Sequence, residues 1–152
     1  MAFYSAASGV SLWRGVDYYK DGKVASFEAA GDGAIRGIVS GSEGRTYDVA
    51  IDVGHPRKST CSCPFAEGCR VICKHMIALY FASIPGSFEL FEEDMRQEEE
   101  RYEREEERWK QETFEQIRSY VAKLSAKEAR ERLTNMLYQD ELDRRYRNND
   151  YW

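Results

Sequence analysis

CSCPFAEGCRVICKHMIALYF, residues 61–81, is the stretch of the 152-residue chain that decides its fold. It holds two cysteines separated by one residue, Cys61 and Cys63, and after nine further residues another cysteine and a histidine, Cys73 and His75. Thiolate and imidazole are the ligands that Zn²⁺ prefers, and four of them complete a tetrahedron without an open position. We therefore predict one structural zinc ion bound by these four residues.

The residues around these ligands favour that geometry. Pro64 bends the chain after the extended cysteine pair, so both side chains can turn toward one ion. The apolar run that follows predicts a helix over residues 74–83, with Cys73 and His75 at its start. The positive end of the helix dipole would stabilise the thiolates.

The remaining cysteine, Cys69, leaves alternatives open. It can be a free thiol in the loop, or it can replace His75 in an all-sulfur site for zinc or an iron–sulfur cluster. His55 could compete as a ligand, although a lone loop histidine beside a proline is more often solvent-facing. A disulfide framework is disfavoured because all four cysteines lie within thirteen positions.

The two cysteine-containing motifs resemble the SWIM zinc finger, whose pattern is C-x-C, a variable gap and C-x-H. The resemblance covers roughly residues 12–84. Upstream it includes residues similar to the opening strand–turn–strand of many prokaryotic members, namely Trp13, Gly15, Tyr18 or Tyr19, Gly22 and Val24. It implies a module that binds nucleic acid or protein, of a kind often found beside helicases or in transposases.

Before the cysteines, the sequence predicts a small antiparallel β-meander. Apolar and polar side chains alternate over residues 47–53, the period of a strand with one buried face. Runs at 24–30 and 34–40 are separated by Gly31-Asp32-Gly33, which suits a tight hairpin turn. With residues 15–20 as an additional first strand, we expect three or four strands covered by the helix over 74–83.

After the cysteines, Pro85-Gly86 breaks the covering helix, and we expect a zinc-binding domain over 1–85 and a charged helical extension over 86–152. Residues 89–124 contain no Gly or Pro and predict one long helix. Ser125 and Glu128 fit a capping box at the start of a final helix, with a loose tail over 148–152.

The predicted fold class is therefore α+β: a small meander with a zinc site and a covering helix, then a long charged helix and a C-terminal helix. We expect these last two helices to pack antiparallel as a helical hairpin. The apolar residues expected to face one another are Phe114, Ile117, Val121 and Leu124 on the long helix and Ala129, Leu133, Leu137 and Leu142 on the final helix.

Charge is distributed unevenly along the chain. Residues 1–85 contain 9 Lys and Arg against 8 Asp and Glu, whereas residues 86–152 contain 13 against 19. Such an acidic chain does not supply the general basic charge of a nucleic-acid-binding protein. No run approaches the ~18 apolar residues of a membrane span, and the N-terminus lacks a signal-peptide pattern. We expect a cytoplasmic protein without a membrane partner.

Catalysis is not expected, since the zinc site has no open position, and we expect no small-molecule substrate. The first hypothesis is a non-enzymatic adaptor or subunit of a larger assembly, whose acidic helix binds a protein through Met95, Tyr102 and Trp109. The alternative is nucleic-acid binding through basic residues around the zinc loop, although such charges are also common in ordinary loops. These basic residues are Arg57, Lys58, Arg70 and Lys74.

Overall fold

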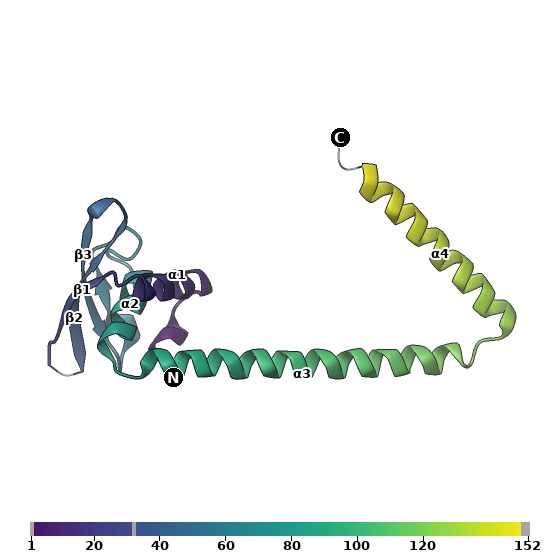
Figure 1. The fold of residues 1–152 in the computed structure, drawn as a ribbon, viewed down its shortest axis with the longest axis horizontal. Coiled ribbons are helices and arrows are strands. Elements are labelled where there is room, and N and C mark those ends of the chain that lie inside the picture. The colour runs from purple at the N-terminus through teal and green to yellow at the C-terminus, as the bar shows by residue number, and fades with distance from the viewer. Residues whose placement is uncertain (1, 32, 150–152) are drawn as a thin grey trace. The chain divides into compact units, whose positions relative to one another are not determined.

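The computed structural model describes residues 2–31 and 33–149, and the chain forms two compact units, the second beginning at Arg96. The elements in chain order are η1 (Phe3–Ala6), α1 (Gly9–Lys20), β1 (Val24–Ala29), β2 (Ala34–Ser40), η2 (Ser42–Gly44), β3 (Thr46–Asp52), η3 (Pro56–Lys58), β4 (Thr60–Cys61), α2 (Lys74–Ser83), α3 (Ser87–Val121) and α4 (Ala126–Asn149) (Figure 1). The predicted α+β class is confirmed.

The four strands form one antiparallel sheet in the order β1-β2-β3-β4. The β1–β2 turn uses Gly31 and Gly33 at φ angles of 79° and 78°, a conformation open to glycine and costly for most other residues. The fourth strand, β4, was not predicted, because two residues are too few to show alternation. Its hydrogen bonding is extended by Ser62, whose backbone N–H donates to the Asp48 carbonyl oxygen at 3.0 Å.

The prediction of a strand at residues 15–20 is wrong, because these residues lie in helix α1. Ser8 caps the helix by accepting a hydrogen bond from the Ser11 backbone N–H at 3.3 Å. Leu12, Val16 and Tyr19 follow at helical spacing and pack against the core. The upstream part of the zinc unit is therefore helix–turn–strand.

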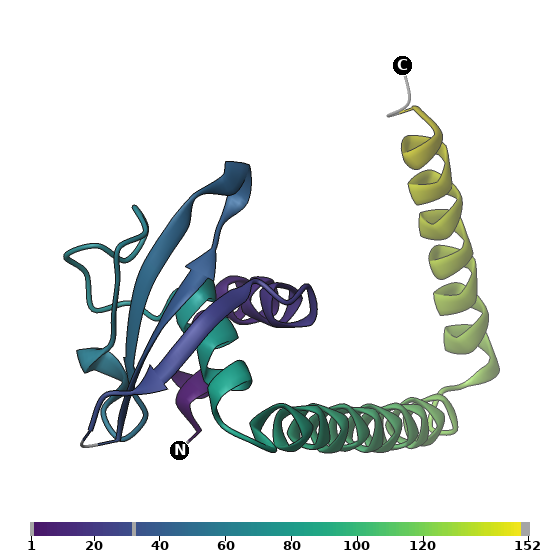
Figure 2. The same ribbon diagram turned by 60° about the vertical axis from the view of Figure 1, so that its left-hand side comes forward.

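Helix α2 lies between the sheet and α1, as Figures 1 and 2 show. Its side chains are apolar on all sides because both faces are covered; Met76, Ile77 and Leu79 are fully buried. The approach to α1 is close at Gly15, where a Cβ atom would lie 2.5 Å from the Ile77 Cβ.

The first turns of α3 belong to the first unit, because an aromatic cluster holds them there. The Phe91 ring lies 5.1 Å from the Tyr4 ring and 5.2 Å from the Phe81 ring, and Phe88 packs 4.8 Å from Tyr19. The Tyr4 hydroxyl donates a hydrogen bond to Asp94. Burial, and then this bond to a carboxylate, raise the pKa of Tyr4.

The second unit consists of the rest of α3 and all of α4. The long uninterrupted helix is confirmed, at 35 residues. The capping box is also present: Ser125 N–H donates to Glu128 Oε2 at 2.9 Å, and Glu128 N–H donates to Ser125 Oγ at 3.3 Å. The prediction of a loose tail is wrong for residues 148 and 149, which belong to α4, and residues 150–152 lie outside the described part of the chain.

The predicted packing of a helical hairpin is not found. Phe114 and Ile117 are 65% and 56% exposed, and Leu133 and Leu137 are 51% and 57% exposed. The apolar residues of the two helices are therefore exposed instead of packed against one another. Among the residues described, no helix is both long and apolar enough to cross a membrane.

Candidate metal centre

Four side chains converge where the sheet meets the start of α2. The Sγ atoms of Cys61, Cys63 and Cys73 and a ring nitrogen of His75 all lie within 4.8 Å of one another. Cys61 ends β4, Cys63 begins the loop, Cys73 is the N-cap of α2 and His75 lies in its first turn. All four are buried, with 1–4% of their surface exposed.

The spacing of these atoms fits a tetrahedral zinc site. His75 Nδ1 lies 3.6 Å from Cys61 Sγ and 3.9 Å from Cys73 Sγ. Zinc bonds of ~2.3 Å to sulfur and ~2.0 Å to nitrogen, at tetrahedral angles, place a nitrogen and a sulfur ligand about 3.6 Å apart. The Cys₃His donor set is one of those found in structural zinc sites, so the cluster fits one zinc ion.

Backbone hydrogen bonds fix the first half of the site. Asp48 N–H donates to Ser62 Oγ at 3.0 Å, which ties the residue between the first two cysteines to β3. After Cys63 the chain turns back, because Ala66 N–H and Glu67 N–H both donate to the Cys63 carbonyl oxygen, at 3.0 and 2.9 Å. This tight turn at Pro64 is the bend expected from the sequence.

The three sulfur atoms are electrostatically coupled. A hydrogen bond from the Cys61 thiol lowers the pKa of Cys73, assisted by His75 and by the Met76 N–H. The same bond, together with burial, raises the pKa of Cys61. Burial, and then the charge of Cys73, raise the pKa of Cys63. Buried thiolates repel one another, and binding of a divalent cation offsets the free-energy cost of this repulsion.

Aromatic rings enclose the histidine ligand. The His75 ring lies 4.5 Å from the Tyr47 ring and 5.3 Å from the Tyr18 ring. Lys74 Nζ donates to the Tyr18 hydroxyl at 2.6 Å. The two tyrosines thus fix the imidazole plane with Nδ1 toward the sulfur atoms, while Nε2 is buried and has no hydrogen-bond partner within the described part of the chain.

Sequence reasoning missed both tyrosines as supports of the site. The alternation over residues 47–53 predicts Tyr47 only as a residue of a strand with one buried face. Tyr18 lies in α1, whose helical character was missed, so its distance from His75 could not be foreseen. The helical spacing of Leu12, Val16 and Tyr19 was the signal that could have placed it.

The alternative ligands lie outside the cluster. Cys69 is a free, exposed cysteine, so the all-sulfur arrangement that would hold an iron–sulfur cluster is not assembled. The His55 side chain is 67% exposed and lies 3.4 Å from Asp52 Oδ1. Both are therefore surface residues of the loops that flank the site.

The four basic candidates fall into two groups. Arg57, Lys58 and Arg70 line one open hollow beside the zinc loop. Lys74 lines a separate hollow of about 380 Å³, together with Arg14 and the exposed Phe65. The structure therefore brings together three of the four predicted basic residues.

The three residues expected to bind a partner through α3 also differ from one another. Tyr102 and Trp109 are 68% and 64% exposed. Met95 is partly buried against the core of the first unit. Two of the three are therefore accessible to a partner.

Comparison with protein families agrees with the geometry of the cluster. Residues 47–84 match the family model described as the SWIM zinc finger. This match contains all four clustered residues, the strand that leads to them and the whole of α2. No curated protein and no solved structure matches the chain.

Proposed function

We propose that this SWIM zinc finger is the structural part of a non-enzymatic interaction adaptor, or subunit of a larger assembly, that works in the cytoplasm. The observation that carries the proposal is the closed Cys₃His cluster, buried to 96% or more at every ligand. Four protein ligands fill the zinc coordination sphere, so the ion cross-links the fold and offers no position to a substrate.

Surface exposure on α3 supports a protein partner. Trp109 is 64% exposed, and the aromatic side chains Tyr102 and Phe114 on the same helix are exposed to a similar degree. Large aromatic residues contribute much of the binding energy in protein interfaces, because they bury a large area at a low cost in side-chain entropy. Helix α3 presents several such residues to solvent.

Co-purification of the native protein, with and without nuclease, tests the proposal. We expect a protein partner that remains bound after nuclease treatment and is lost from the Trp109→Ala variant. Phe65→Ala is the matched control, because Phe65 is similarly exposed, at 61%, but lies on the zinc loop. Loss of every bound component after nuclease treatment would contradict the adaptor proposal.

A second candidate function is nucleic-acid binding, favoured by the hollow lined by Arg57, Lys58 and Arg70. Each phosphate contact releases about one counterion, so three contacts to B-DNA give a slope of log affinity against log salt of roughly −3. We expect neutralising these three residues to flatten that slope, and Lys74→Gln to leave it nearly unchanged. Absence of binding to DNA and RNA at low salt would exclude this function.

A further inference from the structure

The second unit lacks a hydrophobic core of its own. In residues 96–147, whose side chains the structure describes, none is buried. The exposed large apolar residues gather at the end of α3 and in the middle of α4. Isolated helices are marginally stable in water, and helices in proteins are held mainly by packing of an apolar face. We therefore expect the exposed apolar residues of α3 and α4 to pack against a partner.

We call the exposed large apolar residues at the end of α3 and in the middle of α4 the helical stripe. On α3 it comprises Trp109, Phe114, Ile117, Tyr120 and Val121, with exposures of 44–65%. On α4 it comprises Leu133, Met136 and Leu137, with exposures of 51–59%. These are eight large apolar side chains, each 44–65% exposed, and contiguous exposed apolar residues of this kind mark interaction sites.

We propose that a second copy of this chain covers the helical stripe, with the two α3 helices running antiparallel about a two-fold axis. The proposal deepens the proposed function, on which it rests, by naming the partner of the helical surface. A two-fold interface is isologous, so each chain uses the same stripe.

Charge favours a second copy as this partner. Residues 96–149 contain 13 Lys and Arg against 14 Asp and Glu, so two copies of this unit have almost no net repulsion. Most of the net negative charge beyond Pro85 lies elsewhere, because residues 86–95 contain four acidic residues and no basic residue.

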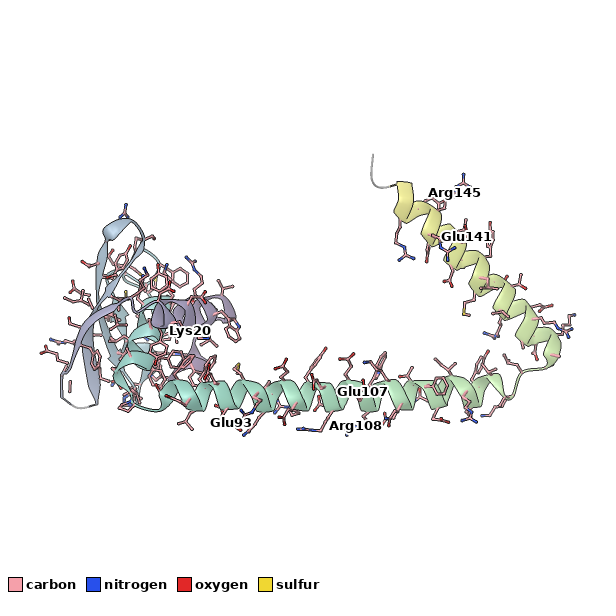
Figure 3. The ribbon with its side chains drawn as sticks, viewed as in Figure 1. Lys20, Glu93, Glu107, Arg108, Glu141 and Arg145 are labelled. Carbon is pink, nitrogen blue, oxygen red and sulfur yellow. The ribbon has the colours of Figure 1, made fainter. Side chains whose placement is uncertain are left out.

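The order of charges along the unit favours the antiparallel direction. Residues 98–107 contain seven acidic and two basic residues, and residues 118–132 contain five basic and two acidic ones. Antiparallel pairing brings the acidic segment of one chain toward the basic segment of the other, whereas parallel pairing places like charges together. Figure 3 shows the side chains of Glu107, in the acidic segment, and of its neighbour Arg108 projecting from α3.

The first test measures the mass of the zinc-loaded full chain by sedimentation equilibrium. We expect a dimer of the 17.6 kDa chain at micromolar concentration, dissociating on dilution with a loss of far-ultraviolet helical signal. Ile117→Glu should weaken dimerisation at least tenfold, whereas Phe65→Glu, at a similarly exposed position on the zinc loop, should not. A monomer at 100 µM, or a dimer unaffected by Ile117→Glu, overturns the proposal.

The second test reverses charges in two separate chains. One chain carries Glu105→Lys, Glu106→Lys and Glu107→Lys, and the other carries Lys123→Glu, Lys127→Glu and Arg130→Glu. Each variant alone should dimerise more weakly than the unchanged chain, and an equimolar mixture should form a heterodimer. Failure of the mixture to recover association contradicts the antiparallel arrangement. Zinc content is measured in every sample, so loss of the metal centre is distinguished from loss of dimerisation.

Discussion

At the scale of single residues, His75 gives the sharpest test of the metal centre. It supplies the one nitrogen ligand atom of the cluster, with Nδ1 at 3.6 and 3.9 Å from two sulfur atoms. We expect elemental analysis to find about one zinc per chain, and His75→Ala to lower the affinity for zinc strongly, since three thiolates cannot complete the site.

The matched control for this substitution is Cys69→Ser. Cys69 lies in the same loop but is exposed and outside the cluster, so its substitution should leave the zinc content unchanged. Full metal retention in His75→Ala, or an iron–sulfur absorption band, would show that the ligand assignment is wrong.

Gly15 gives a second residue-scale prediction. A Cβ atom there would lie 2.5 Å from the Ile77 Cβ and 3.0 Å from the Lys74 carbonyl oxygen. Overpacking of this kind costs about 1–3 kcal/mol, against a gain of about 0.5–1 kcal/mol from replacing a helical glycine by alanine. We expect Gly15→Ala to lower the free energy of unfolding of the zinc unit, measured by denaturant titration.

Gly9→Ala serves as the comparison for Gly15→Ala. Gly9 is also in α1, but no heavy atom lies within 4 Å of its added Cβ. Its substitution should be neutral or slightly stabilising. Equal effects at the two glycines would mean that helices α1 and α2 do not cross as closely as in the structure.

The zinc ligands were predictable because their chemistry is local. Two pairs of ligands, each pair one residue apart, with a proline after the first and an apolar helix after the second, allow few arrangements around one ion. The tyrosines around His75 come from α1 and β3, and their positions depend on tertiary packing. No spacing near the cysteines carries that information.

At the scale of elements, the same contrast between local and tertiary information separates β2 and α2, which were well predicted, from α1. Residues 34–40 and 74–83 were predicted with the bounds observed, because glycine turns and apolar runs delimit them. Helix α1 was missed because Gly15 and three aromatic residues lower its helical propensity. Packing of Gly15 against Ile77 makes the glycine favourable there, which local propensity cannot show.

The capping box of α4 gives an element-scale prediction of pH dependence. Hydrogen bonds from the Ser125 hydroxyl and then the Ser125 N–H lower the pKa of Glu128 below its ordinary value of 4.5. A lowered folded-state pKa contributes stability that is present above the unfolded value and is lost as pH falls through the folded value. We expect the protection of the first turn of α4 against hydrogen exchange, measured relative to the intrinsic exchange rate at each pH, to fall below pH 4.5.

Two variants separate the charge of this cap from its hydrogen bonds. Glu128→Gln keeps a hydrogen-bond acceptor but does not titrate. The protection of the first turn of α4 against exchange should therefore no longer depend on pH in this range. Ser125→Ala removes the cap oxygen, a change that typically costs about 1 kcal/mol, and should raise exchange even at neutral pH. An unchanged pH profile in Glu128→Gln would assign the effect to another group.

At the scale of the whole molecule, the sequence predicted a zinc domain and a helical extension, and the division at residues 85 and 86 stays a prediction. Helix α2 does end before Pro85-Gly86, but the first turns of α3 still belong to the first unit, because Phe88 and Phe91 pack against its core. The failure of the helical hairpin has a physical reason. Apolar residues on two successive helices indicate that each helix packs against something. They do not indicate that the two helices pack against each other.

Removal of the zinc is the prediction that concerns the whole chain. Structural zinc contributes on the order of 10 kcal/mol to the folding of small zinc-finger peptides. Here its four ligands join β4, the loop over residues 62–72 and the start of α2. We expect a strong chelator to accelerate hydrogen exchange across residues 61–83, and added zinc to reverse the change.

The two units should respond differently to the chelator, because α4 contributes no ligand to the metal centre and starts at its own capping box. Exchange in residues 126–149 should therefore be the same with and without zinc at a fixed protein concentration. Cys69→Ser should respond like the unchanged chain, since its thiol is not a ligand. If residues 61–83 keep their protection after complete zinc removal, apolar packing around α2 holds the unit by itself, and the metal has a role other than folding.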